Sequence, residues 1–138
     1  MALRIIEEIF NRSNPDSLAD LIAENIAVHD ADKEITGLQQ LRQGITNLHL
    51  AFPDLQYTVE DILEEGDRVV IRYKGKGTHR GIFRGIPPTG KHMQYSGMLI
   101  WRFADGKLAE HWAVSDVLGM LQQLDVLPPT EQLRGLKV

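Results

Sequence analysis

The sequence contains no cysteine, little aromatic content and no strong excess of either charge. Without cysteine, thiol nucleophiles, disulfides and thiolate metal sites are excluded. A net charge of −4 gives no basic surface for nucleic acid or an anionic membrane. No apolar stretch approaches membrane length, and the amphipathic, acidic start is unlike a signal peptide. We therefore expect a soluble, cytoplasmic protein with neither nucleic acid nor membrane as a partner.

Several common kinds of active site are also missing. The five histidines show no paired spacing with carboxylates of the kind typical of zinc or iron sites, so we expect no metal site. No Gly-x-Ser-x-Gly motif is present for an acyl-enzyme serine. Residues 85–91 match the spacing of a phosphate-binding loop, but two prolines remove amides and His92 replaces the serine or threonine. We interpret this segment as a rigid loop between strands.

The N-terminal part of the chain has a helical pattern. Apolar residues at helical spacing predict a first helix over residues 2–12. Asn14 as N-cap and Pro15 at the first helical position predict a second, short helix through Ile22. A short strand is expected over residues 26–30, and a third helix runs from residue 38 until Pro53 stops it.

The rest of the chain has the pattern of a sheet. Alternating residues predict strands over 55–64, 69–79 and 93–103, and an Asp-Gly turn leads into a last strand over 108–115. Helices followed by an antiparallel meander predict an α+β fold, with N-terminal helices packed on a curved antiparallel sheet. The length suits a single domain, which we place at residues 1–128 with a C-terminal tail at 129–138.

Asp116 is a single carboxylate at the end of the last strand. Period-2 alternation places it on the same face as Trp112 and Val114, toward the expected core. Burial would raise the pKa of this carboxyl group, as a general acid or base near neutral pH requires. The alternative is structural, because an aspartate before Val117 could cap the following helix, which would lower the pKa instead.

Polar-tipped aromatic residues provide candidates for a pocket wall. We predict substrate-binding roles for Tyr57, Tyr73, Tyr95, Trp101 and Trp112, with an ordinary core position as the alternative for each.

His79 is the second catalytic candidate after Asp116, because an imidazole near a carboxylate could share its proton. Its Thr-His-Arg-Gly motif could equally serve a turn. His29 and Asp61 are weaker candidates, Asp61 because it shares the apparent inward face of its strand. His111 has the opposite parity to Asp116 and is expected on the outer face.

Several motifs together resemble one family. They are residues 77–91 (GTHRGIFRGIPPTGK), 102–108 (RFADGKL), 110–112 (EHW), Asp116 and 123–124 (QL), which look like the SnoaL-like polyketide cyclases, or predicted ester cyclases, of the nuclear transport factor 2-like superfamily. The resemblance implies a cone-shaped α+β barrel with a deep apolar pocket and a homodimer. It also implies an aldol ring closure without metal or cofactor, performed by one aspartate, and Asp116 matches that position.

Three hypotheses for function follow. The leading one is a cyclase or isomerase that binds a small apolar carbonyl compound and transfers a proton through Asp116. The second is a non-catalytic module for ligand binding or dimerisation, in which Asp116 caps a helix. The third is an epoxide hydrolase of the same superfamily, which needs an Asp-Arg-Asp arrangement for which Arg102 is the nearby arginine.

Overall fold

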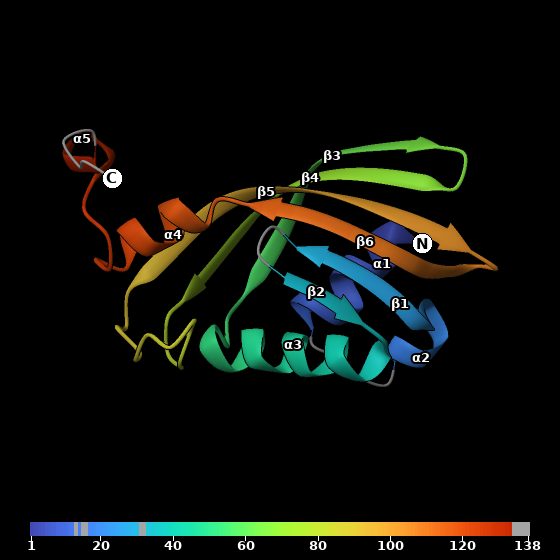
Figure 1. Cartoon of the computed structure of the whole chain (residues 1–138), viewed down its shortest axis with the longest axis horizontal. Helices are drawn as coiled ribbons and strands as arrows, with labels where there is room; N and C mark the ends of the chain where they lie inside the picture. Colours follow the sequence, from blue (N-terminus) through green and yellow to red (C-terminus); the bar gives the residue numbers. More distant parts are fainter. Residues whose placement is uncertain (13, 15–16, 31–32, 134–138) are drawn as a thin grey trace.

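The computed structural model describes residues 1–12, 14, 17–30 and 33–133 and has a curved six-stranded sheet (Figure 1). The strand order is β2-β1-β6-β5-β4-β3. The strands are β1 (Ile22–Asp30), β2 (Lys33–Thr36), β3 (Gln56–Glu65), β4 (Arg68–Thr78), β5 (His92–Ala104) and β6 (Lys107–Ser115). The helices are α1 (Ala2–Ile5), the π-helix η1 (Ile6–Asn11), α2 (Leu18–Leu21), α3 (Leu38–Ala51), α4 (Val117–Gln123) and α5 (Thr130–Leu133). Helices packed on one face of a curved sheet confirm the predicted α+β class.

The first and third predicted helices are confirmed. The first runs from α1 into η1, a π-helical turn that the apolar spacing did not predict. The third is α3, which ends just before Phe52 and Pro53. The second is shorter than predicted, because Ile22 already belongs to β1. Pro15, expected to begin that helix, lies outside the described residues.

The predicted meander is confirmed as β3 to β6, all antiparallel neighbours. One pairing was not predicted: β1 lies parallel to β6, and β2 then pairs with β1. A parallel partner far along the chain leaves no local turn signal, and β2 is too short to show an alternating pattern.

The core lies between the concave side of the sheet and helices α1 to α3 (Figure 1). In β4 every second residue is buried, so Val69, Ile71 and Tyr73 point inward as predicted. Trp101 of β5 is completely buried and faces the same core. No helix in the described ranges is long and apolar enough to cross a membrane.

A bulge in β6 reverses the predicted faces of that strand. Arg102 pairs with Glu110, but Phe103 pairs with Leu108, so Ala109 is an extra residue. Each residue after a bulge changes face. His111 therefore points inward beside Trp101, and Trp112 points outward beside Ile100. The expected inward position of Trp112 and outward position of His111 were both wrong for this reason.

A similar shift moves Asp61 of β3 to the surface. The pairing of β3 with β4 is irregular between Val59 and Asp61, and Asp61 forms an exposed ion pair with Arg72. The expectation that Asp61 faces inward was therefore wrong. The segment expected as a C-terminal tail contains α5, while residues 134–138 lie outside the described part of the chain.

Gly81 allows the start of the loop after β4 to lie directly against α3. The amides of Arg80 and Gly81 both donate to the carbonyl of Ala51. A Cβ atom at position 81 would lie 2.2 Å from the Leu50 carbonyl oxygen, which belongs to the helix backbone and cannot rotate away. Only glycine fits at this contact.

We expect Gly81→Ala to lower the free energy of unfolding by about 3 kcal/mol, measured by chemical denaturation. Gly44→Ala within α3 is the matched control, because a Cβ there meets no atom within 4 Å. Alanine also favours helix over glycine, so this control should raise stability by about 0.5 to 1 kcal/mol. Equal effects of the two variants would contradict the close contact at Gly81.

Candidate functional site

A chain of polar groups runs from the buried core toward the end of β1. The indole Nε1–H of Trp101 donates to Nδ1 of His111 over 2.7 Å. The other ring nitrogen, His111 Nε2, lies 3.8 Å from Oδ1 of Asp30. Asp30 ends β1 and faces inward, since alternate residues Ile26 and Val28 are buried. Three strands thus bring an indole, an imidazole and a carboxylate together.

The environment of His111 determines its protonation. Its side chain is 12% exposed, and burial, assisted by the charge of His29, lowers the pKa of His111 to about 4. The ring is therefore neutral at pH 7. Nδ1 accepts the hydrogen bond from the indole N–H, so the ring proton of His111 lies on Nε2. Nε2 can therefore donate a hydrogen bond on the side of Asp30.

Three tyrosines line the core next to this chain. Tyr73 and Tyr95 each lie opposite a glycine, Gly97 and Gly75, on the neighbouring strand. A Cβ at Gly97 would lie 2.5 Å from the Tyr73 hydroxyl, so glycine makes room for the ring. Tyr57 packs on Tyr73 with ring centroids 4.6 Å apart, and its hydroxyl bonds that of Tyr95 over 2.8 Å.

These tyrosines remain protonated at any physiological pH. Burial raises the pKa of Tyr57, Tyr73 and Tyr95, and neighbouring tyrosines contribute. The negative charge of Asp30 also raises the pKa of Tyr57 and Tyr73. A carboxylate, a neutral imidazole, an indole and three phenol groups form what we call the core polar cluster: Asp30, Tyr57, Tyr73, Tyr95, Trp101 and His111. It combines one base with several hydrogen-bond donors.

Asp116 occupies the expected strand-to-helix junction between β6 and α4. It is exposed, and its Oδ1 accepts a 2.9 Å hydrogen bond from the Gly119 amide as the N-cap of α4. The expected position on the core-facing side was wrong because of the bulge in β6. A role for Asp116 in proton transfer stays a prediction.

His79 is completely buried at the loop after β4. The Thr89 amide donates to His79 Nδ1 over 3.2 Å, so the ring proton of the neutral form lies on Nε2. Within the described residues, Nε2 has no hydrogen-bond partner, and the ring packs against Phe52 and Phe83. Backbone bonds from His79 to Gly90 and Lys91 close the loop over residues 79–91. These contacts favour the turn-forming interpretation of the motif.

The outward side of the sheet carries the other candidates. Trp112 stacks on His29, with Arg68 5.0 Å from its ring centre. His29 bonds Glu110 and Glu34, and the bond to Glu110 is the largest contribution that raises the pKa of His29.

Arg102 also bonds Glu110, and this pair is not the Asp-Arg-Asp arrangement that the epoxide hydrolase hypothesis needs. In the described part of the chain, no three histidine or acidic residues are grouped to hold a metal.

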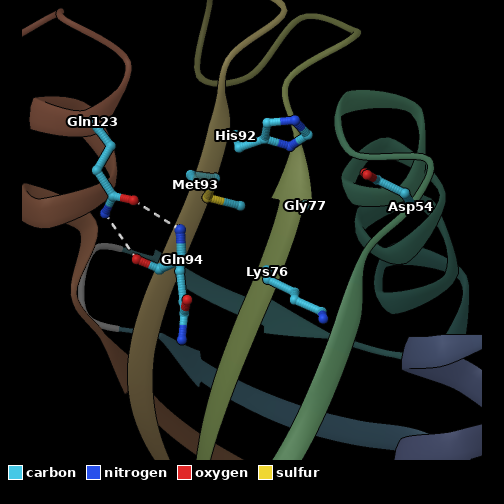
Figure 2. A pocket seen from close by; sticks show the side chains of 7 residues that line it. All are labelled: Asp54, Lys76, Gly77, His92, Met93, Gln94 and Gln123. Carbon is cyan, nitrogen blue, oxygen red and sulfur yellow. Dashed lines mark hydrogen bonds between the residues drawn. The ribbon is translucent and has the colours of Figure 1, made fainter.

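A surface depression of about 410 Å³ lies between α4, the starts of β5 and β3 and the end of β4 (Figure 2). Its walls are mostly polar and consist of Asp54, Lys76, Gly77, His92, Met93, Gln94 and Gln123. None of the residues predicted as catalytic or substrate-binding belongs to this lining. The predicted aromatic residues instead divide between the core polar cluster and the outward face.

The sequence contained a signal for Asp30 that was missed. Alternation from Ile26 through Val28 to Asp30 places a carboxylate inward, by the same argument that was applied to Asp116. His111 could not be found this way, because the bulge at Ala109 depends on pairing with β5 rather than on the local pattern.

Comparison with known proteins gives consistent matches. The family model for SnoaL-like polyketide cyclase matches residues 1–124. Aklanonic acid methyl ester cyclase DauD from Streptomyces sp. strain C5 is 28% identical over 94% of this chain and 83% of its own length. AclR from Streptomyces galilaeus, a proposed hydroxylase, is 31% identical with a TM-score of 0.81, covering 92% of this chain and 94% of AclR. A SnoaL-like cyclase from Agrobacterium tumefaciens, at 22% identity over 86% of this chain and 91% of its own, supports the fold with a TM-score of 0.72.

The buried neutral His111 predicts a specific loss of stability in acid. Its folded pKa of about 4 lies below the ordinary 6.5, so the unfolded chain binds more protons between these values. The free energy of unfolding should therefore fall by about 3 kcal/mol from this group as the pH drops from 7 to below 4.

Denaturation of wild type and His111→Gln across that range checks this expectation. The variant keeps the other acid-sensitive carboxylates, including Asp54 and Glu110, and should show a flatter pH dependence. Identical slopes, or an imidazole resonance of His111 that titrates near pH 6.5, would contradict a buried neutral ring.

Proposed function

Because the chain belongs to the SnoaL-like polyketide cyclase family, we propose that it is a cofactor-independent cyclase or isomerase of the aldol type. Its substrate is a small, largely apolar carbonyl compound, of the kind represented by the aklanonic acid methyl ester in the name of the DauD relative. The observation that supports this proposal is the approach of Asp30 to the neutral His111, at 3.8 Å, with Tyr57 and Tyr73 near enough for the charge of Asp30 to raise the pKa of both. Such a cluster supplies what proton transfer at a carbon atom requires.

An aldol closure needs one base and donors for developing negative charge. In the proposed reaction, the Asp30 carboxylate removes a proton from the carbon next to a carbonyl, which leaves an enolate. His111 Nε2–H and the tyrosine hydroxyls stabilise the enolate oxygen by hydrogen bonds. The enolate carbon then bonds to a second carbonyl carbon of the same molecule, and the proton on Asp30 passes to the new alkoxide. No redox partner is needed.

The geometry favours Asp30 over Asp116 as the proton-transferring group. The Asp30 side chain is 35% exposed, and its Oδ1 lies 3.8 Å from the buried His111 ring, where an electrostatic interaction is stronger than in water. Asp116 is exposed and already accepts a helix amide at Gly119. That bond lends support to the second candidate function, a ligand-binding module without turnover. The variants below separate the two functions.

We also propose a homodimer formed through the outward face of the sheet. Neighbouring strands β4, β5 and β6 present apolar side chains there, with Met98 59% and Val114 66% exposed. Val70 and Ile100 extend the same patch. Paired apolar side chains on a sheet face are suited to burial against a second copy.

Asp30→Asn tests the proposed base. An amide cannot take up the proton, so ring closure of aklanonic acid methyl ester should slow at least about a hundredfold. The reaction is followed by liquid chromatography with mass detection. The folded structure should persist, since asparagine has nearly the same size. Tyr57→Phe should show a smaller, roughly tenfold loss.

Asp116→Asn is the matched control. Asparagine is also a good N-cap, so stability and turnover should both stay close to wild type. Loss of turnover in Asp116→Asn with retention in Asp30→Asn would return the reaction to Asp116. No ring closure by the wild-type protein at any protein concentration would favour the ligand-binding module.

The dimer is tested by charge on the apolar patch. Met98→Glu places two carboxylates against each other in a symmetric interface and should convert the dimer to monomer in light scattering. Glu64→Gln serves as a surface control, because residue 64 is also exposed but lies on β3 outside the patch. A monomeric wild type, or a dimeric Met98→Glu, would contradict this interface.

A further inference from the structure

The depression in Figure 2 is built around an oriented histidine. His92 Nδ1 lies 2.8 Å from Thr78 Oγ1, and Thr78 Oγ1 lies 2.7 Å from Asp54 Oδ2. The Asp54 carboxylate can only accept hydrogen bonds, so the Thr78 hydroxyl uses its single O–H to donate to Asp54. His92 must then donate from Nδ1 to Thr78, which leaves Nε2 with the lone pair of the neutral ring.

Buried contacts hold this chain of bonds in place. The Thr78 side chain is 1% exposed, and its backbone amide donates to the other oxygen of Asp54 over 2.7 Å. These bonds to Thr78 are the main reason why the pKa of Asp54 is lowered. Both carboxylate oxygens are thereby occupied at one side of the depression.

The opposite wall is fixed by a side chain of α4. Gln123 accepts from the Gln94 amide through Oε1 and donates to the Gln94 carbonyl through Nε2, both over 2.8 Å (Figure 2). The first residues of β5 therefore cannot close the depression without breaking two hydrogen bonds.

Lys76 supplies a positive charge to the same depression as the histidine. Lys76 pairs with Gln94 across β4 and β5, and Thr78 pairs with His92 one step further along the same face. Lysine and histidine thus lie diagonally, at a separation of about 7 Å between Cβ atoms. Lys91 and Arg72 have carboxylate partners, whereas Lys76 has no ion pair in the described part of the chain.

We propose that this depression is a second ligand site, which binds a small 2-hydroxy acid. Lys76 pairs with the carboxylate, and His92 Nε2 accepts a hydrogen bond from the neighbouring hydroxyl. The site is independent of the proposed cyclase reaction, because it shares no residue with the core polar cluster.

Three probes of matched shape test the two contacts separately. Mandelate has both groups, phenylacetate lacks the hydroxyl and mandelamide lacks the charge. Titrations of the wild-type protein, followed by the amide resonances of His92 and Gln94, should show mandelate binding at least about tenfold more tightly than either analogue. Equal affinity for mandelate and phenylacetate, or no mandelate binding at millimolar concentration, would overturn the proposal.

Variants assign the contacts to named side chains. Lys76→Met and His92→Leu should each weaken mandelate binding about tenfold or more, and His92→Leu should also abolish the preference over phenylacetate. Lys74→Met is the control, because Lys74 is exposed on the same face of β4 but does not line the depression. An equal loss in Lys74→Met would show a general charge effect and overturn the site.

Discussion

The hydrogen bond between Trp101 and His111 is the interaction on which the core polar cluster depends. It joins two adjacent strands, β5 and β6, across the concave side of the sheet. Because His111 Nδ1 accepts the hydrogen bond from the indole, the imidazole must present its Nε2–H to Asp30. Burial then keeps the imidazole neutral. Loss of this bond would leave both a buried indole donor and an unoriented imidazole.

The bulge at Ala109 makes that bond possible and also explains which predictions failed. The elements of the meander follow from alternation and the Asp-Gly turn, and these signals are local. Local signals do not predict which side chains of β6 face inward, because a single extra residue reverses the face of every residue beyond it. Trp112, His111 and Asp116 were misplaced by this one cause, whereas Tyr73, Tyr95 and Trp101 lie before the bulge and point inward as expected for a core or pocket wall.

The sheet separates two chemically different regions. Its concave side holds a neutral imidazole, tyrosines and one carboxylate among apolar side chains, which suits proton transfer at an apolar carbonyl compound. The depression beside α4 is polar and open, and its histidine is oriented by Thr78 and Asp54. Glycines recur in both regions for the same steric reason: Gly97 and Gly75 leave space for tyrosine rings, and Gly77 lies against Phe52 and Asp54.

In the proposed function, the core polar cluster removes a proton from carbon. The most direct measurement is deuterium exchange into 2-acetylcyclohexanone in D₂O, followed by proton NMR, with binding monitored through the ring resonances of His111. We expect the protein to accelerate loss of the proton between the two carbonyls well above the rate in buffer. A diketone that shifts the His111 resonances but exchanges at the buffer rate would contradict the account.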